Sequence, residues 1–353
     1  IQNLFVFDQI ATYIGLFSVF AYVQFSTKQE SQQSSTGPNK IYQPIVLICS
    51  MILPGTLFVF LVVMPLRTNR NLLDGLRLQG QNVERSFDSF QKALNSRFLG
   101  RTETREQFVM FSLSVGGSNL SGEFKDKILR RAVEEAEKNV VENKQDPRAH
   151  LFLAGLYSRL TASNPTDQNK LLDQALKVLD DARKLSPSKQ LIYFEIADVY
   201  FKKGDLSQAI EALDFSYKLD PNFGTAQINL AVAYIVAGQQ KKADDLLIAS
   251  RGSADVRDMQ LIQAYSRRID LARDRNDKAQ IALYADRLVR TWRLFIEDTP
   301  DNFEYRKRLA LLYVIIGNNQ KANEVLQEAI RYNPIFEKEV REFVEQVQKG
   351  TIQ

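Results

Sequence analysis

The sequence predicts an all-α protein in which two transmembrane helices precede a right-handed solenoid of helical pairs. Three observations predict this fold class. Long apolar segments are confined to the first 65 residues. From residue 66 onward, charged amphipathic segments are broken by Gly, Asn, Asp and Pro, without the alternating pattern of strands. Within that part, a set of small and aromatic residues returns at an interval of 34 residues.

The segment 44–64 gives the stronger of the two transmembrane predictions. It holds 21 residues without a charge, and at about 1.5 Å per helical residue it matches the roughly 30 Å hydrocarbon core of a bilayer. Pro54, next to Gly55 in the middle of the segment, predicts a kink.

The segment 4–25 is the second predicted span. Tyr13 and Tyr22 suit interfacial positions. A carboxylate at the bilayer centre costs about 2.5 to 3.5 kcal/mol, so we expect Asp8 at the interface or facing a protein interior. The polar spacer 26–43 is typical of a solvated hairpin loop. A pair of buried helices in a soluble bundle is the alternative, and a signal peptide fits less well because no Lys or Arg precedes the apolar run.

The composition argues against several classes of function. The net charge of +4, from 46 Lys and Arg against 42 Asp and Glu, is spread without a basic tract and gives little support for a nucleic-acid partner. Cys49 is the only cysteine and His150 the only histidine. These counts argue against a disulfide, a cysteine-based metal cage and Ser-His-Asp catalysis within these residues. We therefore expect no metal site, no cofactor and no complete active site here.

The clearest repeat relates residues 190–223 to residues 224–257. Pairs of like residues 34 positions apart are Ala197/Ala231, Tyr200/Tyr234, Gly204/Gly238, Ala209/Ala243 and Ser216/Ser250. In two antiparallel helices, small residues let the backbones approach, tyrosine fills the remaining wedge, and glycine permits a left-handed turn. Proline then ends the second helix.

Other copies extend the pattern in both directions. The predicted units are 146–189, 190–223, 224–257, a degenerate pair at 258–302, and 303–336. The degenerate pair keeps Pro300 but lacks the glycine. The whole chain is thus divided into a membrane region at 1–65, divergent helical pairs at 66–145, repeats at 146–336, and a capping helix and tail at 337–353.

The small, aromatic, Gly-Asp, Ala and Pro positions of residues 190–223 resemble the tetratricopeptide repeat. The resemblance implies a solenoid whose first helices line a concave groove for protein partners. Most of the lining positions are apolar here, so we expect an apolar peptide or partner helix in the groove. Alternatively, several of these side chains pack against neighbouring repeats or against a terminal helix that folds into the groove. The expected groove residues are Phe152, Leu156, Phe194, Asp198, Phe201, Ile228, Val232 and Ile235.

Other features are expected to be structural. Trp292 is predicted to be a core residue of a second helix, and His150 a surface or cap residue. The charges in KDKILRRAVEEAEK at 125–138 alternate in sign, which is typical of a solvated helix face. GGSN at 116–119 lacks the context of a phosphate-binding loop.

The stretch QNLFVFDQIATYIGLFSVFAYVQF at 2–25 resembles the segment that closes the catalytic loop of bacterial O-antigen ligases and polymerases. Residues 72–76, residues 86–108 and the following repeats resemble the tail of a subset of those proteins that carries tetratricopeptide repeats. The resemblance implies enzymes that move a glycan from an undecaprenyl-diphosphate carrier to an acceptor outside the cytoplasm. Gln2 stands where the family motif often has histidine, so no catalytic role is carried over to this stretch.

The leading hypothesis is therefore the C-terminal part of a polytopic glycan-assembly protein, whose repeats bind a partner protein. A noncatalytic membrane-anchored scaffold is the alternative, and a soluble helical binding protein is the third hypothesis. The expected partners are a protein or peptide in the groove, membrane lipid, and an undecaprenyl-linked glycan through an upstream part. The resemblance places the chain in the bacterial cytoplasmic membrane with its repeats outside the cytoplasm. The excess of Arg67, Arg70 and Arg77 over the two lysines of the spacer slightly favours the reverse orientation.

Overall fold

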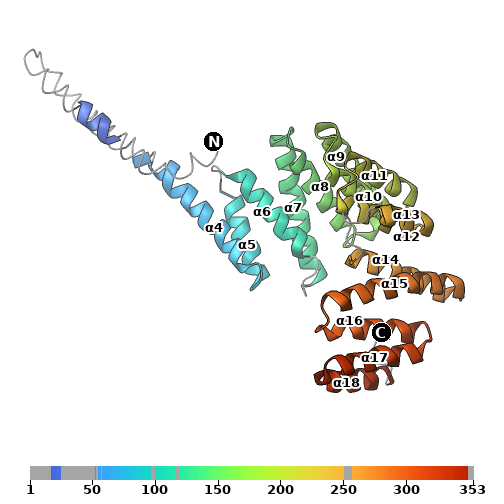
Figure 1. The fold of residues 1–353 in the computed structure, drawn as a ribbon. Helices are drawn as coiled ribbons and strands as arrows, with labels where there is room; N and C mark the ends of the chain where they lie inside the picture. Colours follow the sequence, from blue (N-terminus) through green and yellow to red (C-terminus); the bar gives the residue numbers. More distant parts are fainter. Residues whose placement is uncertain are drawn as a thin grey trace, which may run out of the picture.

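The structure is a computed structural model that describes residues 17–24, 52, 55–56, 58–96, 100–115, 120–249 and 257–348. Every regular element among these residues is helical (Figure 1), which confirms the all-α prediction. Most of the predicted spans at 4–25 and 44–64 lies outside the described residues, as does GGSN at 116–119. Among the helices that the structure does describe, none combines the length and the apolar character that crossing a bilayer requires.

The helices follow one another along a curved row (Figure 1). The row starts with the π-helical turn η2 (Val59–Val63), α4 (Met64–Leu78), α5 (Val83–Leu94), α6 (Arg101–Ser114) and α7 (Gly122–Glu142). The following pairs are α8 (Pro147–Leu160) with α9 (Gln168–Leu185), α10 (Gln190–Lys203) with α11 (Leu206–Leu219), α12 (Gly224–Val236) with α13 (Gln240–Ala249), α14 (Met259–Asp274) with α15 (Lys278–Asp298), and α16 (Phe303–Ile315) with α17 (Asn319–Tyr332). The row ends with α18 (Glu337–Gln348), and short 3₁₀ turns lie at η4 (Pro165–Asp167) and η5 (Pro334–Phe336).

The hairpin of α4 and α5 begins the packed part of the chain. Gly75 lies so close to Phe90 that a Cβ atom on it would be 3.0 Å from the phenyl ring. The Ser86 hydroxyl donates a hydrogen bond of 2.7 Å to the Gly75 carbonyl. The ring of Phe90 in turn stacks on Phe111 of α6, with 5.0 Å between centroids. The glycine thus allows an aromatic contact that joins the first three helices of the packed region.

The turn inside each of the last four helical pairs has one left-handed residue. Gly204, Gly238 and Gly317 have φ angles of 78°, 75° and 77°. In the degenerate pair, Asn276 takes this position with a φ of 54°. The amide of the following Asp277 donates to the Ala272 carbonyl at 2.8 Å. In the glycine turns, the amide of the residue after each glycine likewise donates to a carbonyl in the last turn of the first helix. Asparagine tolerates this conformation better than most residues, so the turn persists without glycine.

The loops between pairs share another hydrogen bond. A side chain at the fourth position of a first helix donates to a carbonyl of the preceding loop; the pairs are Tyr193 with Pro187, Gln227 with Pro221, and Arg306 with Pro300. His150 is at the same position of α8, and its Nδ1 lies 2.9 Å from the Asp146 carbonyl. His150 is only 6% exposed, so the prediction that it lies on the surface is wrong. Its proximity to the helix cap is as expected.

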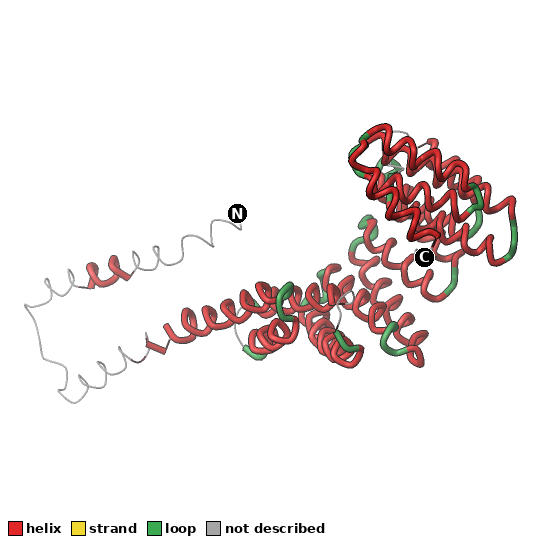
Figure 2. Tube along the Cα trace, turned by 90° about the horizontal axis from the view of Figure 1, so that it is seen from below, coloured by secondary structure: helices red, strands yellow, loops and turns green. Residues whose placement is uncertain are grey.

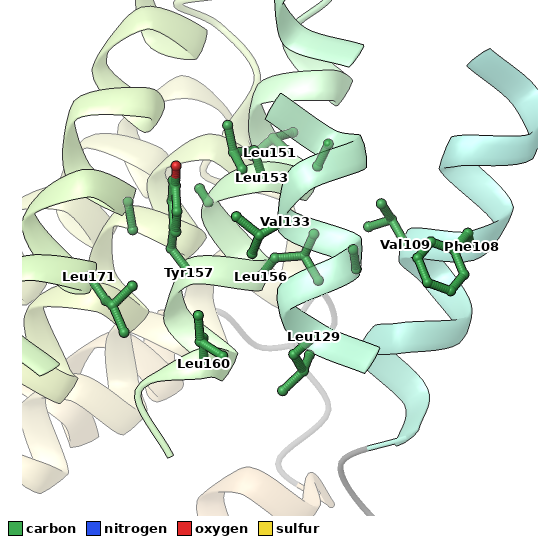
Figure 3. Packing of buried hydrophobic residues seen from close by; sticks show 14 of the residues in the cluster. Phe108, Val109, Leu129, Val133, Leu151, Leu153, Leu156, Tyr157, Leu160 and Leu171 are labelled. Atoms are coloured by element: carbon green, nitrogen blue, oxygen red, sulfur yellow. The ribbon is translucent and has the colours of Figure 1, made fainter. Parts of the chain in front are cut away.

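The largest continuous core runs from α5 to α10. Leu156 of α8 is fully buried and lies beside Val133 of α7 (Figure 3). The helix that carries Val133 includes the predicted solvated segment 125–138, and that prediction fails at Glu135. This carboxylate is buried and pairs with Arg105 of α6, with 3.0 Å between Nε and Oε2.

The last pairs attach to the row in a different way. In the preceding repeats, a first helix packs on the second helix before it, whereas α14 packs on its own partner α15 and on the first helix α12. Ile228 and Ile235 of α12 share a buried cluster with Leu261 and Tyr265 of α14. Figure 2 shows the resulting C-terminal stack at the end of the molecule away from α4. Trp292 is buried in the same cluster, as its core prediction requires.

Candidate partner-binding groove

The first helices α8, α10 and α12 carry all eight residues that were expected to line the groove. The structure divides them into two groups. Five are half-buried and retain accessible surface: Phe152, Phe194, Asp198, Phe201 and Val232. Three are buried: Leu156, Ile228 and Ile235.

The three buried residues belong to the core and not to an open groove. Leu156 and Ile235 have no exposed surface, and Ile228 retains 6%. Leu156 packs within the core between α7 and α8. Ile228 and Ile235 are covered because α14 packs on the face of α12 that carries them. The repeat pattern places these residues correctly on a first helix, but it carries no information about a later helix that covers them.

Two other groove residues make mainly internal contacts. Phe152 packs against the large core that contains Leu156. Val232 packs against the cluster formed by α12 and the C-terminal helices. The part of the expected groove with most accessible surface is therefore centred on α10.

An apolar patch lies at the N-terminal end of α10. Leu191 keeps 47% of its surface exposed, and Phe223 in the loop before α12 keeps 39%. The ring of Phe223 stacks on Phe194, with 6.4 Å between centroids and 19° between planes. Exposed apolar and aromatic side chains held by packing can bind a partner side chain with little loss of side-chain entropy. We call Leu191, Phe194 and Phe223 the α10 patch.

A polar cluster lies further along α10. Lys202 donates to Asp198, with 2.7 Å between Nζ and Oδ2, and to the hydroxyl of Ser158 at 2.6 Å. Ser158 of α8 lies 3.2 Å from the same Asp198 oxygen. Phe201 beside this cluster packs its ring against the small core of α10, α11 and α12. The cluster therefore joins neighbouring first helices at the edge of the apolar surface.

Glu195 adds a carboxyl group with a raised pKa to this surface. Burial raises the pKa of its carboxyl group above the ordinary value, and the negative charge of Asp198 raises it further. The positive charges of Lys202 and Arg159 act in the opposite direction without cancelling the effect. A carboxylate with a raised pKa gains stability when a cationic group approaches. The α10 surface thus combines apolar contacts with a site that favours a positive charge.

The groove positions of the repeat include Leu191 and Lys202 of α10, but sequence reasoning missed Phe223, Ser158 and Glu195. Phe223 lies in a loop, outside the helical positions on which the groove assignment was based. Ser158 and Glu195 are ordinary polar residues in the helical pattern, and only the packing of α8 on α10 reveals their surroundings. The aromatic residue directly after the proline turn at 221–223 was the one available signal for Phe223.

The described residues contain no group of three or more His, Cys, Asp or Glu side chains arranged to hold a metal ion. The chemistry that this surface does offer is noncovalent: aromatic contact area, a hydroxyl, an ion pair and a carboxylate that favours a cation. These groups suit recognition of another chain.

Comparison with known proteins identifies the repeat type. The tetratricopeptide repeat family profile matches residues 167–222 and 194–247. Similar solved structures include a thermophilic TPR protein from Thermus thermophilus, with 17% identity, a TM-score of 0.39, and coverage of 70% of this chain and 99% of that chain. PilF of Pseudomonas aeruginosa has 18% identity, a TM-score of 0.39, and coverage of 70% and 98%. MamA from Desulfovibrio magneticus has 14% identity, a TM-score of 0.37, and coverage of 52% and 93%.

No curated protein sequence matches the chain. The family match covers the helices from α9 to α13, which include the left-handed turns at Gly204 and Gly238 and the hydrogen-bonded proline loops. The sequence profile and the helical pairs agree over this region. Residues 167–247 are tetratricopeptide repeats by this match.

Proposed function

We propose that the chain is a membrane-anchored protein-interaction module that holds a segment of a partner protein against α10. The observation that carries this proposal is the α10 patch, in which Leu191 and Phe223 are exposed while Phe194 and Phe223 stack. The partner segment presents an apolar side chain to the patch. A Lys or Arg of the same segment lies near Glu195, because a positive charge offsets the unfavourable ionisation of that carboxyl group.

The anchor is part of the proposal and rests on the sequence. Residues 44–64 form an uncharged segment long enough to cross a bilayer, and 4–25 supplies a second span. The interacting units then follow the boundaries 146–189, 190–223, 224–257, 258–302 and 303–336. The protein resides in the bacterial cytoplasmic membrane with its repeats outside the cytoplasm. External protease applied to spheroplasts should digest the repeats, whereas full protection would reverse this topology.

A narrower candidate function is the tail of a glycan-assembly protein. The resemblance of residues 2–25 to the loop-closing segment of O-antigen ligases and polymerases favours it. Under this proposal the repeats bind a partner protein near the site of glycan transfer, and an upstream part handles the undecaprenyl-linked glycan. Deleting the coding region from the native organism should change the length or the attachment of surface glycans. Unaltered surface glycans would contradict the glycan-assembly function and favour the membrane-anchored interaction module.

The partner-binding proposal is tested with peptides selected from a displayed random library on the full chain. Leu191→Glu should weaken the binding of the selected peptides at least about tenfold, because a central apolar contact contributes more than about 1.4 kcal/mol to the free energy of binding. Met110→Glu is the matched control, since Met110 is 53% exposed on α6, away from α10. Peptides that bind the Leu191 variant and the native chain equally well would exclude the α10 patch as the peptide-binding site.

A further inference from the structure

The face of α4 that points away from α5 carries a band of arginine and leucine. Thr68 and Gly75 are buried on the opposite side of the helix, toward α5. At about 100° per residue, Leu66, Arg70, Leu73 and Arg77 fall within roughly 60° of one another around the helix. All four are exposed, as is the neighbouring Arg67.

The arginines of α4 have no anionic partner among the described residues. No carboxylate lies within ion-pair distance of Arg67, Arg70 or Arg77 in that part of the chain. Asp74, the only acidic residue of α4, is half-buried and forms no ion pair with them. By contrast, Arg131 of α7 pairs with both Glu134 and Glu135. Within the part of the chain that the structure describes, the exposed face of α4 is thus positive without a compensating carboxylate.

The same helix is apolar on the N-terminal side of these arginines. The π-helical turn Val59–Val63 runs directly into α4, and Val63 and Met64 are both in the helical conformation. Pro65 has no amide hydrogen and crowds the preceding turn, which explains a wider π turn at this point. Phe58 is 59% exposed and Val59 41% exposed. A continuous helix that passes from exposed apolar residues to exposed arginines has the pattern of a boundary between hydrocarbon and phospholipid headgroups.

We propose that Arg67 and Arg70 bind the phosphate groups of anionic phospholipids where the chain leaves the membrane. This inference rests on the proposed membrane anchor. The guanidinium group suits phosphate because its planar donors can form paired hydrogen bonds. The lipid contact fixes the depth of α4, and therefore the position of the repeats, relative to the membrane surface.

The helical rise determines which arginines can reach the headgroups. With Met64 at the edge of the hydrocarbon, Arg67 lies about 4.5 Å and Arg70 about 9 Å further along the axis. The polar layer on each side of a bilayer adds roughly 5 to 8 Å, and a long arginine side chain can reach back toward it. Arg77 lies about 20 Å from Met64 and is out of reach. This difference makes Arg77 an internal control of the same chemistry on the same face.

The test uses the full chain in nanodiscs, with Cys49→Ser and Asn69→Cys carrying an environment-sensitive fluorophore. Asn69 is exposed between the two arginines. Adding phosphatidylglycerol to phosphatidylcholine discs should shift the emission to the blue, and high salt should reverse the shift. The phosphatidylglycerol fraction that gives half of the shift should rise about fivefold in Arg67→Gln and in Arg70→Gln. Arg77→Gln should match the unsubstituted chain.

Carbonate extraction of membranes separates the two proposals. A chain released by carbonate refutes the membrane anchor and, with it, headgroup binding at the exit of a span. If the chain is retained but the fluorophore emission changes neither with phosphatidylglycerol nor with the substitutions, lipid binding is refuted and the membrane anchor is not. A retained chain with equal losses in the Arg70 and Arg77 variants refutes the assignment to the first two arginines. Only the retained chain with the graded response supports the inference.

Discussion

Arg105 shows how a single buried residue can hold two helices together. It is 1% exposed, and it donates to Glu135 at 3.0 Å and to Glu142 at 2.5 Å, both on α7. Burial opposes ionisation of Glu135, but hydrogen bonds from Lys138 and Arg105 outweigh burial and lower its pKa. The buried arginine therefore depends on a carboxylate that remains ionised. The alternating charges in the sequence predicted a charged face on α7 but did not predict that Glu135 is buried.

Replacing Arg105 with methionine should reduce the free energy of unfolding by about 2 to 3 kcal/mol, because the substitution breaks a buried pair while Lys138 still neutralises Glu135. Urea denaturation followed by circular dichroism measures the loss. Arg130→Met is the control, since Arg130 is half-exposed and pairs with Asp126, and it should cost less than about 1 kcal/mol. Equal losses would show that the buried pair contributes no more than the surface pair.

The pH dependence of the Arg105 variant follows from the lowered pKa of Glu135. A lowered folded-state pKa contributes stability that is present above the ordinary carboxyl pKa and is lost as pH falls through the folded-state pKa. The gap between native chain and variant should therefore narrow on acidification below about pH 4. A constant gap would contradict the coupling between Arg105 and Glu135.

Glu195 should show the opposite behaviour. Burial raises the pKa of Glu195 in the folded state. The stability that comes from the neutral carboxyl group is therefore present below the ordinary carboxyl pKa and is lost as pH rises through the raised pKa. Glu195→Gln should raise the melting temperature at pH 7 and have little effect near pH 4. Thermal melts at both values test this expectation. Glu211→Gln, at an exposed position of α11, should change neither melt.

At the scale of the element, the turn inside a helical pair is defined by conformation more than by residue type. The sequence pattern located Gly204, Gly238 and Gly317 because each is a glycine. It did not locate Asn276, although this residue has the same left-handed conformation and the same hydrogen bonding around it. A search for one residue type misses a turn that another residue can also form.

Gly317→Ala should reduce the free energy of unfolding by about 1 kcal/mol, because a side chain at φ of 77° is strained even though open space surrounds the Cα. Asn276→Gly should cause no loss, since glycine adopts a positive φ freely. Chemical denaturation of both variants provides the comparison. A loss in the asparagine variant as large as that in Gly317→Ala would mean that the Asn276 side chain has a separate role.

At the scale of the whole molecule, α12 links two parts of the solenoid. Its Leu230 and Ala233 pack with α10 and α11, while Ile228 and Ile235 pack with the C-terminal helices. Local periodicity predicted the helices, the left-handed glycines and the apolar faces. It could not predict that α14 would pack on α12, because the repeat pattern places each first helix on the second helix before it, which here is α13. The groove assignment at Ile228 and Ile235 failed for the same reason. The two transmembrane segments stay predictions.

Ile235→Ala should weaken the attachment of the C-terminal stack. The side chain is fully buried between α12 and α14, and its truncation should cost about 2 to 5 kcal/mol. Hydrogen exchange should increase in α14 and α15 and remain unchanged in α8 and α9, because a solenoid transmits stability mainly between neighbours. Uniformly faster exchange would indicate one cooperative unit throughout the repeats.

The loop carbonyls at Asp146, Pro187, Pro221 and Pro300 are bound by a histidine, a tyrosine, a glutamine and an arginine. Four unrelated side chains thus perform one task, and all that they share is a hydrogen-bond donor at the end of a long or flat group. The position can drift during evolution while the geometry of the loop persists. A combinatorial library at residue 227 should return several donor residues and few aliphatic ones, so chemical function, and not residue identity, defines the consensus at this place.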